Sequence, residues 1–236
     1  MSEKINSTSR SENSTKNEEI TIPSNVLIVG PTNSGKSKYV VEQLRGPYKN
    51  KFDYIVLVCP TYVYNKTYND FGLGDNHLFV IVPEQDQVDF ELKQMTLLFK
   101  GTNTLFIIDD CASTKDVKNR VSQLVNLGFS ARHLNISVWV LTQQFTSISK
   151  PFRENISKLV TFYNPNSKDM NAIFDSYGGE LSSEEKKDLY YKLKIYPYSY
   201  IIFNLKFPYS IQLHIVPYIY PYIVDEHGHR RPFIRQ

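Results

Sequence analysis

Short, largely apolar runs recur along the first two thirds of the chain, and polar or turn-forming residues separate them. Apolar side chains follow one another in these runs, which is typical of strands covered on both faces. The runs predict strands at residues 26–29, 54–59, 78–82, 104–110, 136–141 and 158–163. Since sheets buried on both faces are usually parallel, the pattern favours a mainly parallel sheet.

Between these runs, apolar residues recur at the spacing of an amphipathic helix. Val88, Leu92, Met95, Leu98 and Phe99 follow this spacing and predict a helix over residues 85–99 that covers the sheet. Cap residues, charged first turns and Gly or Pro at segment ends predict further helices. These span residues 38–45, 117–129 with Gly128 as the end, 148–155 entered at Pro151, 167–177 with Ser167 as the cap, and 182–194.

The C-terminal third has a different pattern, because apolar and polar residues alternate over residues 199–207 and again over 211–215. Alternation of this kind predicts two antiparallel strands joined by a turn at residues 208–210. Together these elements predict an α/β fold with a mainly parallel central sheet, helices on both faces and a C-terminal antiparallel β-hairpin. We expect one domain over residues 23–224.

The two ends of the chain differ from this predicted domain. Residues 1–22 are rich in Ser, Asn, Glu and Lys, so we expect a disordered polar tail, either a plain solvated extension or an interaction arm. Residues 225–236 contain His227 and His229 together with three arginines. Two histidines spaced in this way do not make a metal site, so we expect a solvated basic tail, with a contact to DNA as the alternative.

The composition agrees with a globular, intracellular protein. The chain has 236 residues, of which 41% are hydrophobic and 22% are charged. No apolar run approaches the ~20 residues of a transmembrane helix, and the N-terminus lacks the apolar segment of a secretory signal. Cys59 and Cys111 lie in or beside apolar runs, as reduced, buried cysteines do. The net charge of +3 permits a nucleic-acid partner without arguing for one.

The strongest chemical signal is the segment G-P-T-N-S-G-K-S, which follows the first predicted strand and precedes a predicted helix. Its glycines let backbone N–H groups turn toward phosphate oxygens, and the helix N-terminus adds its dipole. Lys36 is placed to reach the β- and γ-phosphates, and Ser37 offers a hydroxyl to Mg²⁺. The predicted phosphate-binding loop comprises Gly30, Pro31, Thr32, Asn33, Ser34, Gly35, Lys36 and Ser37. The alternative, a chance match in a Gly/Ser turn, does not explain the strand before it and the helix after it.

A second signal is a pair of acids, Asp109 and Asp110, at the end of a buried strand. This has the form of a Walker B element, in which Asp109 would hold Mg²⁺ through water and Asp110 would orient the attacking water. The alternative is a strand-ending turn that is acidic for no catalytic reason. The phosphate-binding loop upstream favours the Walker B interpretation.

Gln143 follows the strand predicted over residues 136–141. In doubly wound sheets, ligand groups gather at the carboxyl ends of strands. Gln143 is therefore placed to meet the γ-phosphate or the attacking water. The alternative roles are a helix cap or a loop amide.

In this order the motifs resemble those of the FtsK–HerA superfamily of ring-forming, DNA-pumping ATPases. V-G-P-T-N-S-G-K-S, F-I-I-D-D-C, and A-R-H-L-N-I-S leading to L-T-Q-Q most resemble the poxvirus-type genome-packaging ATPases of large DNA viruses, virophages and Polinton-like elements. The resemblance covers about residues 24 to 165. It implies a RecA-like P-loop NTPase fold.

The resemblance also implies ATP hydrolysis with Mg²⁺, coupled to moving double-stranded DNA of any sequence into a preformed capsid at its portal vertex. It implies a ring-shaped homo-oligomer with no membrane partner, located in the host cytoplasm, a viral factory or the virion. By the same resemblance, Lys36 and Ser37 bind phosphate and metal, Asp109 and Asp110 are the Walker B acids, and Gln143 is the polar sensor. Asp110 replaces the more usual glutamate, and its shorter side chain leaves its role as base open.

An arginine from the neighbouring subunit is expected to stabilise the transition state. Arg132, before the sensor strand, and Arg153, after it, are the candidates. Either could instead form a structural ion pair or a helix-end contact.

Two other classes of function remain as alternatives. A small-molecule P-loop kinase usually has an arginine-rich lid, but residues 46–103 contain no arginine. A nucleotide-dependent scaffold that does not hydrolyse would have lost Lys36, Ser37 or Asp109, and all three are present.

Overall fold

The computed structural model describes residues 22–64, 66–68, 77–84, 87–111, 122–216, 222–224 and 230–232. The predicted N-terminal tail, apart from Ile22, lies outside these residues. The first part of the helix predicted over residues 117–129 lies outside them as well.

The core of the protein is an eight-stranded sheet with the strand order β3-β2-β4-β5-β1-β6-β7-β8. All pairings among β1 to β6 are parallel, whereas β7 pairs antiparallel with β6, and β8 pairs antiparallel with β7. The strands are β1 Asn25–Val29, β2 Tyr54–Val58, β3 Leu78–Ile81, β4 Thr104–Asp109, β5 Ile136–Thr142, β6 Lys158–Phe162, β7 Tyr200–Asn204 and β8 Ser210–His214. This confirms the predicted parallel sheet with a C-terminal antiparallel hairpin.

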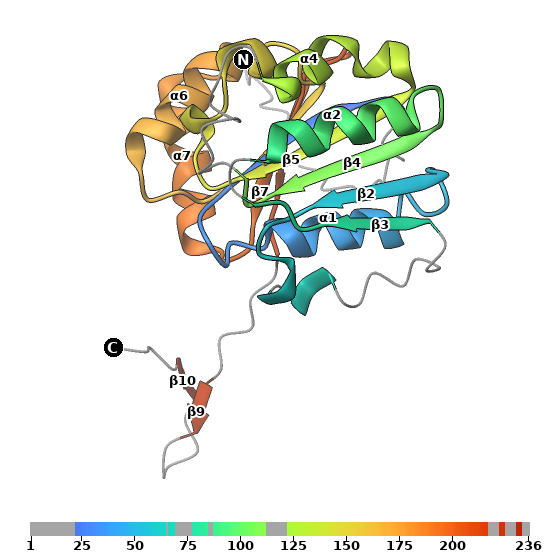
Figure 1. Ribbon diagram of the computed structural model, residues 1–236. Helices are drawn as coiled ribbons and strands as arrows, with labels where there is room; N and C mark the ends of the chain where they lie inside the picture. Colours follow the sequence, from blue (N-terminus) through green and yellow to red (C-terminus); the bar gives the residue numbers. More distant parts are fainter. Residues whose placement is uncertain are drawn as a thin grey trace.

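Helices cover both faces of the sheet, and Figure 1 shows α1 on one face with α2 and α4 on the other. The α-helices are α1 Lys36–Arg45, α2 Val88–Phe99, α4 Gln123–Ser130, α5 Lys150–Arg153, α6 Ser167–Tyr177 and α7 Ser183–Ile195. Short 3₁₀ helices are η1 Tyr62–Tyr64, η2 Lys66–Tyr68, η3 Ala131–Leu134 and η4 Phe145–Ser147. Among the described residues, no helix is long and apolar enough to cross a membrane.

The apolar runs are continuous because side chains from both faces of each central strand are buried. In β1, Leu27 and Val29 join the core that α2, α4 and α6 cover, while Val26 and Ile28 join the core beneath α1. All five residues of β1 are buried, so the strand that carries the phosphate-binding loop is fixed from both sides.

Within α2, the prediction that Leu98 faces the sheet is wrong, because this side chain is 64% exposed. The buried stripe consists of Val88, Leu92, Thr96 and Phe99. At 100° per residue, Leu98 lies well outside the arc that these four positions share.

Gly128 does not end its helix as predicted, because α4 continues to Ser130. A Cβ at Gly128 would lie 3.0 Å from Cδ2 of Phe152 in α5. Gly128 therefore allows α4 and α5 to approach closely, and its role is in packing between the two helices.

A correction and an addition concern the ends of segments. Asn166, and not Ser167, caps α6, because its side chain accepts a hydrogen bond from the backbone N–H of Lys168 (3.1 Å). The predicted solvated tail over residues 225–236 contains a strand, β10 Arg230–Pro232, which pairs with β9 Tyr222–Val224. Backbone pairing of this kind is open to polar segments too, so composition alone did not reveal it.

Candidate active site

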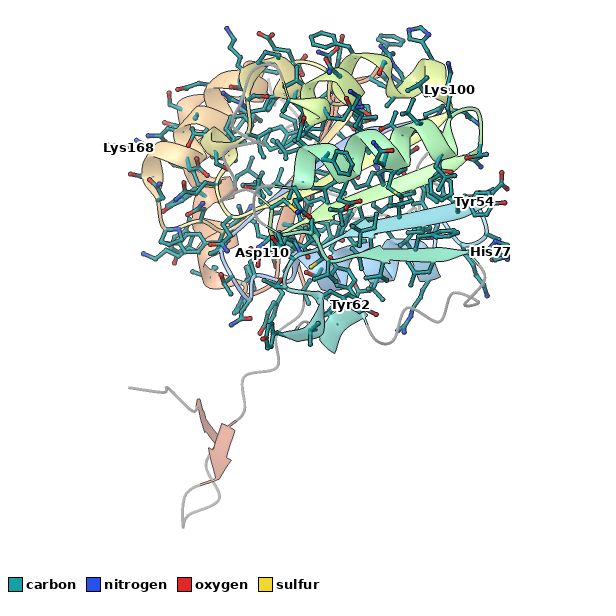
Figure 2. The ribbon with its side chains drawn as sticks, in the orientation of Figure 1. Tyr54, Tyr62, His77, Lys100, Asp110 and Lys168 are labelled. Carbon is teal, nitrogen blue, oxygen red and sulfur yellow. The ribbon has the colours of Figure 1, made fainter. Side chains whose placement is uncertain are left out.

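Apart from the two candidate arginines, the predicted site residues come together at the carboxyl ends of the central strands β4, β5 and β1, where the loops after them surround a cleft of about 890 Å³. Residues 32–37 of the phosphate-binding loop, Asp109, Asp110 and Gln143 all line this cleft. Figure 2 shows Asp110 and Tyr62 at this end of the sheet, with Tyr54 and His77 at the opposite end. Parallel strands explain this grouping, because their carboxyl ends all lie at the same edge of the sheet.

The phosphate-binding loop requires glycine at two positions, at Gly30 for lack of space and at Gly35 for its backbone conformation. A Cβ at Gly30 would lie 2.6 Å from Ser34 Oγ and 2.9 Å from Phe162 Cβ, so no side chain fits there. Gly35 has a φ of +104°, which favours glycine. Gly30 N also donates to Thr142 O (3.1 Å), which ties the loop to the end of β5.

The side chain of Lys36 is buried and folds back onto the start of the phosphate-binding loop. Its Nζ donates to the carbonyl oxygens of Gly30 (2.7 Å) and Pro31 (2.9 Å). Burial lowers the pKa of Lys36, and the nearby carboxylates of Asp109 and Asp110 oppose that shift. The ammonium group is thus held at the centre of the loop, where an anion with several negative oxygens would be attracted.

Asp109 is buried at the end of β4, and two hydroxyl groups donate to the same carboxylate oxygen. Ser37 Oγ donates to Asp109 Oδ2 (3.0 Å), and Tyr68 Oη donates to it as well (2.5 Å). Burial raises the pKa of Asp109, while the two hydroxyl donors and Lys36 counteract this. Burial and the Asp109 charge raise the pKa of Tyr68 well above its usual value, so this phenol stays protonated and able to donate.

Asp110 follows the strand in a left-handed conformation, with a φ of +58°. Aspartate tolerates this region better than most residues, because its short polar side chain can bond locally. Thr61 Oγ1 donates to Asp110 Oδ2 (3.1 Å). The second acid is therefore exposed to the cleft and held from the loop after β2.

Gln143 lies in the loop after β5, and its side chain is exposed on the cleft. The buried carboxylate of Asp169, in the first turn of α6, holds this loop through hydrogen bonds to its backbone. It accepts hydrogen bonds from the backbone N–H groups of Phe145 (2.6 Å) and Thr146 (3.1 Å). Asn164 Nδ2 donates both to Gln143 O and to Asp169 Oδ2, at 3.3 Å each. These contacts fix the direction in which Gln143 leaves the strand.

The two candidate arginines are not among the residues that line the cleft. Arg132 is exposed in η3, ahead of the amino end of β5. The Arg153 guanidinium lies 4.4 Å from the Phe145 ring centre, and its Nε donates to Ile148 O (3.0 Å). Neither arginine acts on the cleft of its own chain in this arrangement, and a role toward a neighbouring copy stays a prediction.

Sequence reasoning missed Tyr68, Thr61 and Asp169, which hold the predicted site residues in place. Tyr68 precedes Asp109 by 41 positions, in a polar segment with no periodicity. The one available signal was that aromatic residues, which are often buried, occur in a segment otherwise rich in Asn, Asp and Thr. The contacts connect segments far apart in the chain, so no local pattern predicts them.

The oxygen atoms beside Asp109 suit a magnesium ion. The Ser37 hydroxyl and the Asp109 carboxylate are adjacent, and Mg²⁺ prefers one or two such protein oxygens together with phosphate and water. The described residues contain no cluster of three or more acidic, His or Cys side chains that could hold a metal ion. Within those residues the buried Ser34 Oγ has no hydrogen-bond partner, so the phosphate-binding loop still has a hydroxyl group to offer a phosphate oxygen.

Comparison with known proteins yields a family match and several structural likenesses. The model of the family described as Poxvirus A32 protein matches residues 12–196. No curated protein sequence matches the chain. The DNA-packaging ATPase from Sulfolobus turreted icosahedral virus has a similar structure, with 20% identity, a TM-score of 0.62, and coverage of 84% of this chain and 100% of its own.

The genome-packaging NTPase from Sulfolobus turreted icosahedral virus 2, solved with ATP-γ-S, is similar at 19% identity with a TM-score of 0.60. That likeness covers 83% of this chain and 98% of the viral protein. At such identities the likeness concerns the fold, and it confirms the predicted P-loop NTPase architecture.

Proposed function

The chain belongs to the poxvirus A32 protein family, and we propose that it is an ATP-hydrolysing motor that moves double-stranded DNA into a preformed viral capsid. The observation that carries the proposal is the cleft in which the phosphate-binding loop faces Asp109, Asp110 and Gln143. The two viral proteins of similar fold are a DNA-packaging ATPase and a genome-packaging NTPase, which supports the same assignment.

In the proposed complex, the phosphate-binding loop holds the triphosphate of ATP. Backbone N–H groups and the Ser34 hydroxyl donate to phosphate oxygens, and Lys36 exchanges the Gly30 and Pro31 carbonyls for the β- and γ-phosphates. Ser37 and, through water, Asp109 are the residues that would hold Mg²⁺. When bound, the ion neutralises charge on the β- and γ-phosphate oxygens.

Asp109 has a fixed orientation that suits this role. Tyr68 and Ser37 both donate to Oδ2, so Oδ1 is the oxygen through which Asp109 would accept a hydrogen bond from water and so help to hold the ion. A hydroxyl that donates to a carboxylate keeps its own lone pairs, so Ser37 can bond to Asp109 and ligate the ion at once.

Hydrolysis then needs a water molecule in line with the γ-phosphorus. We propose that Gln143 orients this water and that Asp110 accepts its proton as the new O–P bond forms. The bond between the γ-phosphorus and the bridging oxygen breaks, and its electron pair leaves with ADP. Thr61 positions Asp110 for this step through its hydrogen bond to Oδ2.

The arginine that stabilises the transition state would come from a second copy of the chain in a ring. Arg132 and Arg153 are the candidates, and the exposure of Arg132 leaves its guanidinium accessible to a neighbour. The motor would act inside the infected cell, at the portal vertex or an equivalent opening of the capsid.

Contact with DNA through its phosphates would be independent of sequence. Binding that neutralises phosphates releases counterions, so affinity should fall steeply as salt rises. A strong preference for one DNA sequence that survives high salt would contradict this part of the proposal.

Steady-state ATP hydrolysis with and without double-stranded DNA tests the proposal. We expect DNA of any sequence to raise the rate, and Lys36→Ala to abolish hydrolysis while the protein stays folded. Native mass measurement with ATP and DNA should show a ring. If DNA has no effect and a nucleoside monophosphate instead consumes ATP in equal amount, the protein is a kinase; if ATP binds without turnover, it is a scaffold.

A further inference from the structure

The connection between α7 and β7 is a tight turn with an unexpected residue at its third position. Ser199 N donates to Tyr196 O (3.2 Å), and Pro197 and Tyr198 are the two central residues. Tyr198 has a φ of +64°. Proline at the first central position and positive φ at the second define a type II turn, which normally has Gly or Asn where this chain has tyrosine.

A bulky side chain in this backbone region is an outlier that costs free energy. The turn itself gains nothing from tyrosine, because glycine adopts the same φ without a steric penalty. The side chain therefore requires an explanation outside the turn.

The ring of Tyr198 lies beside Gly35 of the phosphate-binding loop. Its Cδ1 is 3.5 Å from the point that a Cβ on Gly35 would occupy, and Phe162 Cε1 lies 3.4 Å from the same point. Phe162 is buried, whereas Tyr198 is 51% exposed and lines the cleft. One part of the tyrosine side chain thus lies beside Gly35 of the loop, and the side chain as a whole is half exposed at the cleft.

The order of the strands identifies which end of a nucleotide would meet this ring. Asp109 and Gln143 follow β4 and β5, on one side of β1. Tyr198 precedes β7, which lies beyond β6 on the other side of β1. A γ-phosphate directed at the acids and Gln143 leaves the α-phosphate, ribose and base to extend past Gly35 toward Tyr198.

We propose that Tyr198 is the base-binding residue of the nucleotide site and that its ring stacks on the adenine of ATP. This inference rests on the proposed function, since it takes ATP as the ligand of the cleft. Stacking on a π-face offers no hydrogen bonds to distinguish one base from another, so it provides affinity for the base more than selectivity. The strained turn then serves to hold the ring beside the phosphate-binding loop.

Calorimetric titration of the full-length protein with Mg²⁺ plus either ATP or inorganic tripolyphosphate separates base contacts from phosphate contacts. Stacking of a base on an aromatic residue is worth about 5- to 150-fold in affinity. We expect Tyr198→Ala to weaken ATP binding by that factor and to leave tripolyphosphate binding unchanged. Tyr198→Phe, which keeps the ring, should bind ATP like the original protein.

Tyr198→Gly provides a second variant that suits the turn. It should melt at a higher temperature than the original protein, because glycine removes the strain, and yet bind ATP more weakly. A residue needed only for packing would lose stability in that variant. Tyr209→Ala, at an exposed tyrosine in the turn between β7 and β8 and outside the cleft, is the matched control and should change neither ligand's affinity.

Three results would overturn the inference. ATP affinity could be unchanged in Tyr198→Ala, or ATP and tripolyphosphate affinities could fall together, which would make the ring a support for the loop. Tyr64 is a second exposed tyrosine that lines the cleft, on the side of Asp109 and Asp110. The third result would be that Tyr64→Ala, and not Tyr198→Ala, weakens binding of ATP while tripolyphosphate binding is unchanged. If the original protein binds neither ligand, the proposed function fails first, and that result is distinct from the other three.

Discussion

Tyr68→Phe removes a single hydroxyl from the buried contact between η2 and the carboxylate at the end of β4. Tyr68 is 1% exposed, and its hydroxyl donates to Asp109 Oδ2 across 2.5 Å. Phenylalanine fills nearly the same volume, so the loss is confined to the hydrogen bond. A hydrogen bond to a charged group contributes about 1.5–3 kcal/mol. At about 2–4 °C per kcal/mol for a chain of this size, the metal-free protein should melt about 3–12 °C lower.

The same variant should bind magnesium less well. Without Tyr68, one donor to Oδ2 remains, and the Asp109 side chain can rotate away from the orientation that the metal-bound water needs. Substitutions of groups that orient metal ligands cost about 10–100-fold in metal affinity. ATP titrations at a series of Mg²⁺ concentrations should show this loss, with the affinity for metal-free ATP unchanged.

Tyr177→Phe is the matched control. The Tyr177 hydroxyl donates to Arg153 O (2.7 Å), away from the cleft, so its removal should lower the melting temperature without altering the dependence on Mg²⁺. If Tyr68→Phe and Tyr177→Phe show the same dependence on Mg²⁺, then Tyr68 supports the fold alone and its assignment as a positioning residue is wrong.

Three further predictions address other parts of the site. Gly30→Ala brings a methyl group to within 2.6 Å of Ser34 Oγ, so it should destabilise the protein by about 1–3 kcal/mol and abolish ATP binding, measured by melting and calorimetry. Asp169→Asn places an amide NH₂ group among backbone N–H donors, so it should lower the melting temperature and kcat while ATP affinity is unchanged. An unchanged kcat would show that Asp169 does not position Gln143. Burial raises the pKa of Asp109 in the folded protein, so the metal-free protein should lose stability as pH rises from the ordinary aspartate pKa to the raised one. Mg²⁺-dependent ATP affinity should increase over the same pH interval, because the carboxylate becomes charged. Asp109→Asn should remove both trends.

Much of the fold follows from local chemistry. Each central strand is a short apolar run, and the phosphate-binding loop is contiguous, so both could be recognised one segment at a time. The capping box that begins α7 joins Ser182 and Glu185, only three residues apart, so the start of this helix also depends on local sequence. Ends of elements were less certain where two residues competed for one role, as Asn166 and Ser167 did at the start of α6.

The supporting contacts of the site depend on tertiary structure. Asp109 could be predicted because it ends a strand, but its partner Tyr68 lies in a segment without periodicity, and packing alone brings the two together. Gly128 looked like a helix end because glycine often is one, yet the nearness of Phe152 gives it another role. The positive φ of Tyr198 could likewise not be predicted from the sequence, because tyrosine is not typical of this position in a turn.

Displacement of a third DNA strand from a triplex tests most directly whether this protein is a DNA-moving motor. A motor that advances along the duplex should release the third strand in the presence of ATP and Mg²⁺, whatever the sequence of the flanking DNA, and more slowly as salt rises. Lys36→Ala and ATP-γ-S should stop the release. ATP hydrolysis at an undiminished rate with the third strand still bound would contradict the account.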